Sequence, residues 1–306
     1  MNAESLGPFL AFMSSVTWAV GATGYSRLSQ TYSPYAINFT RAIFSFPIFV
    51  LAVFAFSGGW HGGLESFAAL KAVNYGWLFI SMVASYAVGD IFFMASAKAM
   101  GVPGALAIAS SYPIFNSLAS SVFEGERLGL VQIAGLLITV LGVVLVILNG
   151  PRRGDDKGSG RNWTKGILYG FATAVFWALN SLAIAKGGHG VSPFAGNAFR
   201  MIVAACLCAC FGRYFYPKER VMIPGAVLLS TSWLFFVEAV LGSLFFMYGL
   251  SHSTMAIGST LSSLAPVISV PVAWALGMEK FSFYRTLGVI LVVAGICLLV
   301  GGSQIL

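Results

Sequence analysis

Long apolar runs, separated by polar connections, fill the chain from one end to the other. Each run has close to the ~20 residues that a helix needs to cross the apolar layer of a bilayer. Because the runs are continuously apolar and do not alternate with a period of two, they predict membrane-spanning helices and not the strands of a membrane barrel. The ten runs cover residues 6–26, 34–56, 75–97, 103–123, 129–149, 165–186, 194–215, 229–250, 256–276 and 283–302.

One polar stretch differs from the short connections between the runs. Residues 150–164 are rich in glycine and in charged side chains, which predicts a linker. The linker would divide the chain into a first half, 1–149, and a second half, 165–306, with five helices in each. Since most other connections are short, helices that follow each other along the chain are expected to be antiparallel.

Composition places the chain in lipid. Of its 306 residues 58% are hydrophobic and only 9% are charged, and the mean hydropathy is +0.86. Soluble domains contain about 25% charged residues, and a domain of this size could not bury so much apolar surface in one core. We therefore expect an all-α integral membrane protein. The same values exclude a soluble enzyme, a secreted disulfide scaffold and, despite the net charge of +7, a nucleic-acid-binding protein.

The two halves repeat each other in sequence. Matching residues lie 159 positions apart at the start of each half and 153 positions apart from residue 92 onwards. Because each half holds an odd number of helices, the second half must enter the membrane from the opposite side. Inverted repeats of this kind are typical of transporters, whose substrate site lies near the midplane between the repeats. The matching pairs include Trp18 with Trp177, Asn38 with Asn197, Arg41 with Arg200, Pro113 with Pro266, and Glu126 with Glu279.

These paired features resemble the drug/metabolite transporter superfamily, and in particular its EamA-type members. Each half has a tryptophan in its first helix, a Ser-Pro followed by an arginine in its second and a proline in its fourth. A Gly125-Glu126 motif precedes the fifth helix, although the second half has Met278-Glu279 instead. The resemblance covers nearly the whole chain. It implies ten helices and transport of amino acids, sugars, nucleotide sugars or drugs; aromatic amino-acid exporters form one branch.

Polar and aromatic side chains share one face of the first helix in each half. Trp18 lies four residues after Ser14, and Trp177 lies between Thr173 and Asn180 at similar spacings. Both tryptophans lie ~18 Å along their helices, which is too deep for the aromatic belt at a membrane surface. The pattern therefore predicts a central cavity lined by both faces, with an interfacial belt as the alternative.

Two carboxylates lie inside predicted spans. On insertion scales a central Asp, Lys or Arg costs ~2.5–3.5 kcal/mol, so each should face protein or water. Asp90 shares a helix face with Tyr86 and Met94, and Glu238 lies near the middle of the eighth run. A carboxylate held away from water can take up a proton, which makes protons a candidate coupling ion. The alternative is a structural ion pair with Arg41, Arg200 or Lys98.

Two further pairs of motifs occur in both halves. Pro113 and Pro266 follow paired serines and are expected to disturb their helices, since proline lacks an N–H. The serines could meet a polar solute, or each could bond to its own backbone. Asn38 with Arg41 and Asn197 with Arg200 each share a helix face and are interpreted as structural or gating pairs at opposite membrane faces.

Together these patterns give two candidate sets of residues. The predicted substrate-binding set is Ser14, Trp18, Tyr86, Asp90, Met94, Ser110, Ser111, Tyr112, Thr173, Trp177, Asn180, Glu238, Ser262 and Ser263. The predicted gating or structural set is Asn38, Arg41, Pro113, Asn197, Arg200 and Pro266.

The function that these observations favour is secondary transport of small organic metabolites by alternating access, with amino-acid export as the leading hypothesis. A flippase of a lipid-linked carrier, or a nucleotide-sugar or drug transporter on the same fold, is the alternative. The sequence has no Walker A, GxSxG or HExxH motif, so we expect no enzyme activity, no cofactor and no metal. The expected partners are a small-molecule solute, the lipid bilayer and protons, in a multi-pass protein of the inner (plasma) membrane that is a monomer or weak dimer.

Orientation in the membrane has two conflicting indications. Twelve Lys and Arg residues fall in connections after odd-numbered helices and three after even-numbered ones. Because positive loops stay in the cytoplasm, this bias predicts that both termini lie outside. The family resemblance instead implies cytoplasmic termini, and the sequence leaves the choice open.

Overall fold

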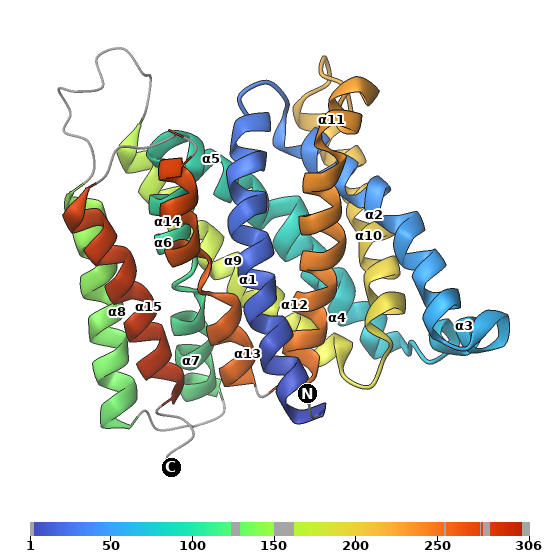
Figure 1. Cartoon of the computed structure of the whole chain (residues 1–306), viewed down its shortest axis with the longest axis horizontal. Helices are drawn as coiled ribbons and strands as arrows, with labels where there is room; N and C mark the ends of the chain where they lie inside the picture. Colours follow the sequence, from blue (N-terminus) through green and yellow to red (C-terminus); the bar gives the residue numbers. More distant parts are fainter. Residues whose placement is uncertain are drawn as a thin grey trace.

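The computed structural model describes residues 3–123, 129–149, 162–253, 255–275, 277 and 282–301. Every regular element in these residues is helical, and the helices stand side by side as a bundle (Figure 1). The elements of the first half are α1 (Ala3–Leu28), α2 (Pro34–Phe56), α3 (Gly59–Ala68), α4 (Ala72–Met82), η1 (Val83–Gly89), α5 (Asp90–Met100), α6 (Val102–Ala109), α7 (Tyr112–Phe123) and α8 (Leu130–Leu148). Those of the second half are α9 (Trp163–Gly188), α10 (Pro193–Phe215), α11 (Gly225–Phe235), η2 (Phe236–Gly242), α12 (Ser243–Ser251), α13 (Met255–Ser262), α14 (Ala265–Ala275) and α15 (Phe283–Gly301).

The ten apolar runs of the sequence correspond to these elements, which confirms the predicted fold class. Six helices, each counted through any π-helical part, are long and apolar enough to cross a membrane, and shorter apolar helices cover the fifth, ninth and tenth runs. The short helices α6 and α7 form the fourth run. Several runs combine elements: α4, η1 and α5 form the third, and α11, η2 and α12 form the eighth. The short helix α3, between the second and third runs, was not among the predicted elements.

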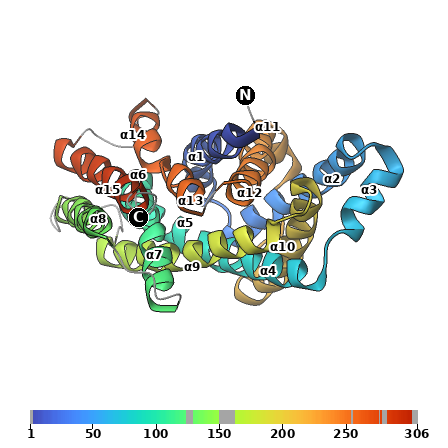
Figure 2. The same ribbon diagram turned by 90° about the horizontal axis from the view of Figure 1, so that it is seen from below.

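The two halves interleave. The first helix of each half packs against the third run of the other half: α1 contacts η2 and α12, and α9 contacts α4 and α5. The two most extensive contacts join equivalent helices, α2 with α10 and α8 with α15, and these pairs lie at opposite ends of the bundle (Figures 1 and 2). A surface between the halves therefore runs through the centre of the molecule.

Glycines allow the closest of these approaches. A Cβ atom added to Gly142 on α8 would lie 2.6 Å from the backbone nitrogen of Val292 and 2.7 Å from the carbonyl oxygen of Gly288. In α1, a Cβ atom on Gly21 would overlap the side chain of Glu238. Small residues are the usual means by which membrane helices bring their backbones together.

Two π-helical segments occur at equivalent positions in the repeat. Val83–Gly89 and Phe236–Gly242 are separated by the same 153-residue offset. The backbone N–H of Asp90 donates to the carbonyl of Ser85, and that of Ser243 donates to the carbonyl of Glu238, both spanning five residues. Such segments are rare and are frequent at functional sites.

The fourth and ninth runs are broken where the prolines predicted a disturbance. One break separates Ala109 from Tyr112 and the other separates Ser262 from Ala265. Each proline lies in the first turn of the helix that follows, where its missing N–H costs no hydrogen bond. The Gly125-Glu126 and Met278-Glu279 motifs, and most of the expected 150–164 linker, lie outside the described residues.

Candidate functional site

A cavity of about 100 Å³ lies between the two halves. It is bounded by both π-helical segments and by residues at both helix breaks, Ser110 and Ser262, so the irregular elements of the fold meet around it. Its lining residues are Ser14, Thr17, Trp18, Arg41, Ser85, Tyr86, Asp90, Ser110, Tyr112, Trp177, Asn180, Arg200, Glu238, Gly242, Ser243, Phe246 and Ser262.

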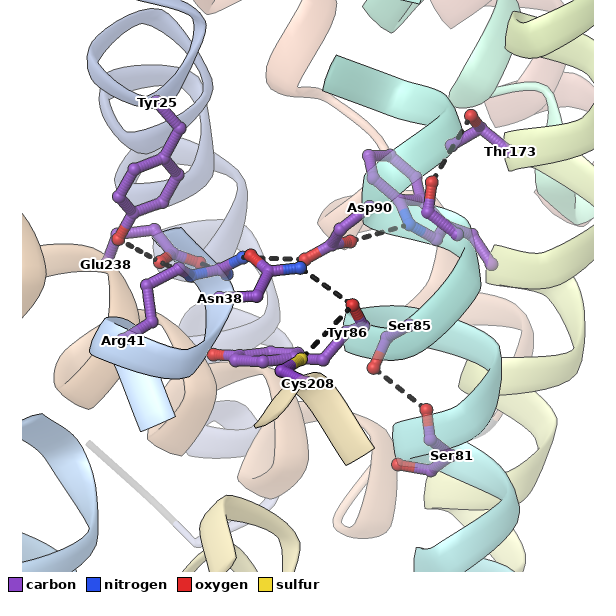
Figure 3. Close-up of polar contacts among 12 residues, drawn as sticks. Tyr25, Asn38, Arg41, Ser81, Ser85, Tyr86, Asp90, Thr173, Cys208 and Glu238 are labelled. Atoms are coloured by element: carbon purple, nitrogen blue, oxygen red, sulfur yellow. Dashed lines mark hydrogen bonds and ion pairs between the residues drawn. The ribbon is translucent and has the colours of Figure 1, made fainter. Parts of the chain in front are cut away.

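Arg41 joins two carboxylates at the wall of this cavity. Its Nη1 lies 2.6 Å from Oδ2 of Asp90, and its Nη2 lies 2.8 Å from Oε1 of Glu238 (Figure 3). A third bond of 3.1 Å runs from Nε to Oε2 of Glu238. Arg41 and Asp90 belong to the first half and Glu238 to the second, so this ion-pair cluster ties the halves together. Only 2% of Arg41 is exposed.

Neighbouring side chains complete the hydrogen bonding of the cluster. The Tyr25 hydroxyl donates to Oε2 of Glu238 at 2.6 Å, and Nε1 of Trp177 donates to Oδ1 of Asp90 at 3.1 Å. Oδ1 of Asn38 accepts from Nη1 of Arg41 at 2.8 Å. All four carboxylate oxygens therefore have partners, which is the condition under which buried charges are tolerated.

Aromatic rings surround the Arg41 guanidinium. Its central carbon lies 4.2 Å from the ring centre of Tyr86, 4.6 Å from that of Tyr25 and 5.6 Å from that of Trp18. Trp18 also meets Trp177 edge to face, with 5.4 Å between ring centres. The repeated tryptophans thus pack against each other beside the cavity, away from a surface belt, and screen the cluster.

The repeat counterpart of this arginine has different partners. Nε of Arg200 donates to the Ser81 hydroxyl at 3.0 Å, and Nη1 donates to Oδ1 of Asn197 at 2.7 Å. Within the described residues no carboxylate oxygen lies within 4.0 Å of Arg200, although only 3% of the residue is exposed. The two positions that would supply carboxylates by the repeat hold Ser85 and Ser243.

Most of the predicted substrate-binding residues line the cavity. Four do not, because their side chains are used elsewhere. The hydroxyls of Ser111, Ser263 and Thr173 donate to carbonyls three or four residues earlier in the chain, and Met94 packs in the apolar core. The ten that line it are Ser14, Trp18, Tyr86, Asp90, Ser110, Tyr112, Trp177, Asn180, Glu238 and Ser262.

The duplication of Arg41 and Arg200 in the two halves predicts positions at opposite membrane faces, which is not where the structure places them. Both line the same cavity. Each sits seven residues into a 23-residue helix, about 10 Å along an axis of roughly 35 Å. A long side chain then carries the charged group further towards the centre. Their partners Asn38 and Asn197 orient them from one turn away.

Sequence reasoning missed part of the lining. Ser85 and Ser243 could have been found, because the repeat aligns them with Glu238 and Asp90. Thr17 adjoins Trp18 in sequence, but Gly242 and Phe246 carry no signal without knowledge of the π-helical segment. Within the described residues, no group of three or more His, Cys, Asp or Glu side chains could hold a metal ion.

Comparisons with known proteins agree with this architecture. The model of the EamA-like transporter family matches residues 5–148 and 164–301. An uncharacterized transporter of Archaeoglobus fulgidus is 26% identical over 95% of this chain and 96% of its own length. The uncharacterized transporter YyaM of Bacillus subtilis is 22% identical over 74% of this chain and 72% of its own. One solved crystal structure, 21% identical, covers 95% of this chain and 94% of its own with a TM-score of 0.66, so the two share a fold.

Proposed function

The chain belongs to the EamA-like transporter family, and from this premise we propose that it exports amino acids across the plasma membrane. Membership makes the protein a multi-pass membrane transporter of small solutes. The amino-acid assignment goes further and rests on one observation: a small cavity, lined mostly by buried residues, that presents both signs of charge and both aromatic and hydroxyl groups. An amino acid is a small solute that carries both a carboxylate and an ammonium group.

The size of the cavity supports a small metabolite. Drug-sized ligands occupy pockets of about 300–1,000 Å³, whereas this cavity measures about 100 Å³. A nucleotide sugar or an amphipathic drug would need a much wider site. The lipid-carrier flippase, the other alternative, would need an opening to the bilayer for the lipid tails.

The interleaved halves support alternating access. In inverted-repeat transporters one half rocks against the other around a site between them. Here the Arg41–Glu238 pair crosses that surface, and the breaks at Ser110 and Ser263 interrupt two helices at the level of the cavity. We propose that these breaks absorb the bending while the ion-pair cluster keeps the halves in register.

Protons are proposed as the coupling ion. A proton on Asp90 or Glu238 would neutralise one partner of Arg41 and weaken its ion pair. Because Arg41 holds one carboxylate from each half, the proton would change the attraction between the halves. Proton uptake and movement of the halves would then be linked through a single side chain.

The test is transport by purified protein in proteoliposomes. Vesicles loaded with each of the twenty amino acids are assayed for exchange and uptake, with and without a pH gradient. We expect transport of a few amino acids, stimulated by the gradient in the wild type and not in Asp90→Asn. Failure across the panel, with transport of sugars or drugs or movement of a labelled lipid between leaflets, would refute amino-acid export.

A further inference from the structure

Three buried polar atoms beside the cavity lack a hydrogen-bond partner. They are Nε1 of Trp18, the hydroxyl of Tyr86 and Oδ1 of Asn180, and all three residues line the cavity. A buried polar atom left unpaired loses its hydrogen bonds to water without replacement, so such atoms are rare in native structures. Their concentration around one cavity indicates a ligand that supplies the missing partners. Two of them can donate a hydrogen bond and one can accept.

A buried cation at the same cavity also lacks an anion. Arg200 uses Nε and Nη1 for Ser81 and Asn197, while its Nη2 makes no hydrogen bond within the described residues. Asp90 is close enough to interact with Arg200 electrostatically, but its two oxygens are bound by Arg41 and Trp177. Half of the guanidinium fork is therefore available to a carboxylate.

The charges around the cavity are separated in space. With both carboxylates ionised, the cluster of Arg41, Asp90 and Glu238 carries a net charge of −1, and Arg200, which lies more than 4.0 Å from either carboxylate, carries +1. The cavity is thus neutral as a whole but dipolar. This arrangement complements a zwitterion and opposes a simple cation at the Arg200 end.

We propose that Arg200 binds the carboxylate of the transported solute, assisted by the Tyr86 hydroxyl, and that Asn180 accepts a hydrogen bond from its ammonium group. This assignment rests on the proposed amino-acid transport and gives the solute an orientation. Asn197 and Ser81 are positioning residues, because they fix the plane of the guanidinium without facing the solute. An Arg fork matches a carboxylate better than the point charge of Lys does.

The repeat explains how such a site arises. Arg41 and Arg200 are equivalent, but only Arg41 has protein carboxylates, since Ser85 and Ser243 stand where the second half's pair would be. The solute's carboxylate would complete at Arg200 the ion pair that Asp90 and Glu238 complete at Arg41. The bound and empty states therefore differ by one buried ion pair.

The test measures binding to the detergent-purified full chain, by thermal unfolding and by competition. Two matched probe series are used: L-alanine, L-alaninamide and propionate, and L-phenylalanine, L-phenylalaninamide and 3-phenylpropionate. In the wild type we expect at least one amino acid to bind at least 30-fold more tightly than its amide, because an unpaired buried charge costs 2 kcal/mol or more. Arg200→Gln should reduce this ratio to about 3-fold or less. The matched control is Arg213→Gln, an exposed arginine on the same helix, which should keep the wild-type ratio.

A second pair of variants covers the case in which Arg200→Gln does not fold. Arg200→Lys keeps the charge and should retain a preference for the acid while weakening its binding about 10-fold. Tyr86→Phe should weaken binding of the amino acid by a similar factor and leave binding of its amide unchanged. Wild-type affinity for the acid in both variants would overturn the assignment.

The two proposals fail in different ways. If the wild type transports amino acids but a folded Arg200→Gln still prefers acid over amide, the Arg200 assignment is wrong and amino-acid export stands. If the wild type transports no amino acid yet binds propionate or 3-phenylpropionate in an Arg200-dependent manner, export is wrong and the carboxylate site stands. If no probe with a carboxylate binds the wild type, the Arg200 assignment is refuted whatever the transport assay shows.

Discussion

At the scale of single residues, the energetics of the interior centre on Arg41. It is almost fully buried and makes ion pairs with Asp90 and Glu238, whose oxygens are further bound by Trp177 and Tyr25. A buried ion pair as a whole adds little to stability, because desolvation offsets the attraction, but removing one partner leaves a costly unpaired charge. The cluster therefore contributes more to holding the two halves in one arrangement than to net stability.

Loss of this arginine should destabilise the protein strongly. Arg41→Gln would leave two carboxylates facing each other without a cation, and we expect a loss of about 3–5 kcal/mol in unfolding free energy. Thermal unfolding in detergent measures it, with the exposed Arg213→Gln as control. Adding Glu238→Gln to Arg41→Gln should recover part of the loss, since one unpaired charge is removed. Wild-type stability in Arg41→Gln would contradict the role of the cluster.

The two repeated tryptophans should respond differently to loss of the indole N–H. Nε1 of Trp177 donates to Asp90, whereas Nε1 of Trp18 has no partner. Trp177→Phe should therefore lower stability by about 1.5–3 kcal/mol, as for hydrogen bonds to charged groups. Trp18→Phe should lower stability less than Trp177→Phe does, because it loses ring packing but no hydrogen bond, and it should weaken solute binding. Equal effects of the two variants on stability, measured by thermal unfolding, would refute this distinction.

Helical spacing identifies candidates on the right face but not which of them reach a cavity. Trp18 and Trp177 are found because a large amphipathic side chain deep in a span is unusual. Thr173 lies four residues before Trp177, just as Ser14 lies four residues before Trp18. Its hydroxyl nevertheless donates to the carbonyl of Tyr169 in its own helix. Such local competition between backbone and cavity depends on side-chain rotamers, which the sequence does not reveal.

At the scale of elements, regular helices were predictable and irregular ones only in part. The run 34–56 coincides with α2, because Ser33-Pro34 is a strong helix-start signal and Ser33 accepts from the N–H of Ala36. Prolines predicted the disturbances in the fourth and ninth runs. The π-helical segments carry no comparable signature, since they arise from packing of the surrounding helices, and the short α3 was hidden by its polar residues.

The close contact between α8 and α15 gives a test at this scale. Gly142→Ala would place a methyl group against the backbone of the facing helix and should cost about 1–3 kcal/mol, as overpacking does. Gly76→Ala is the control, because a Cβ there meets nothing within 4 Å; it should be neutral or stabilising by up to about 1 kcal/mol. Thermal unfolding compares the two. If Gly142→Ala is as stable as Gly76→Ala, the helices do not approach as closely as described.

At the scale of the whole molecule, symmetry of the backbone coexists with asymmetry of charge. Equivalent helices pair, and the π-helical segments and helix breaks recur in both halves. The carboxylates do not: Asp90 and Glu238 occupy positions that the repeat does not relate. A symmetric frame suits movement between two opposite-facing states, while an asymmetric lining allows the same solute to be held in one orientation.

Basic residues are also distributed unevenly, between the two membrane faces of the protein. The start of α1 and the end of α15 lie on the same side in Figure 1, with the end of α10 and the start of α11 on the opposite side. By sequence, twelve Lys and Arg residues fall in connections that follow odd-numbered runs, as the one between α10 and α11 does, against three in connections that follow even-numbered runs. Because basic loops resist transfer across the membrane, the richer side is expected in the cytoplasm and the termini outside.

Labelling of single introduced cysteines decides this orientation. In a background where the four native cysteines are replaced, Glu65→Cys places an exposed thiol on α3, on the side of the termini, and Glu219→Cys places one between α10 and α11. A maleimide that cannot cross membranes should label Glu65→Cys in intact cells and Glu219→Cys only after permeabilisation. The reverse pattern would mean that the termini are cytoplasmic, as the family resemblance implies, despite a twelve-to-three charge bias. With cytoplasmic termini, an exported solute would enter the protein from the face that carries the termini. The same measurement therefore shows which end of the cavity opens to the cytoplasm.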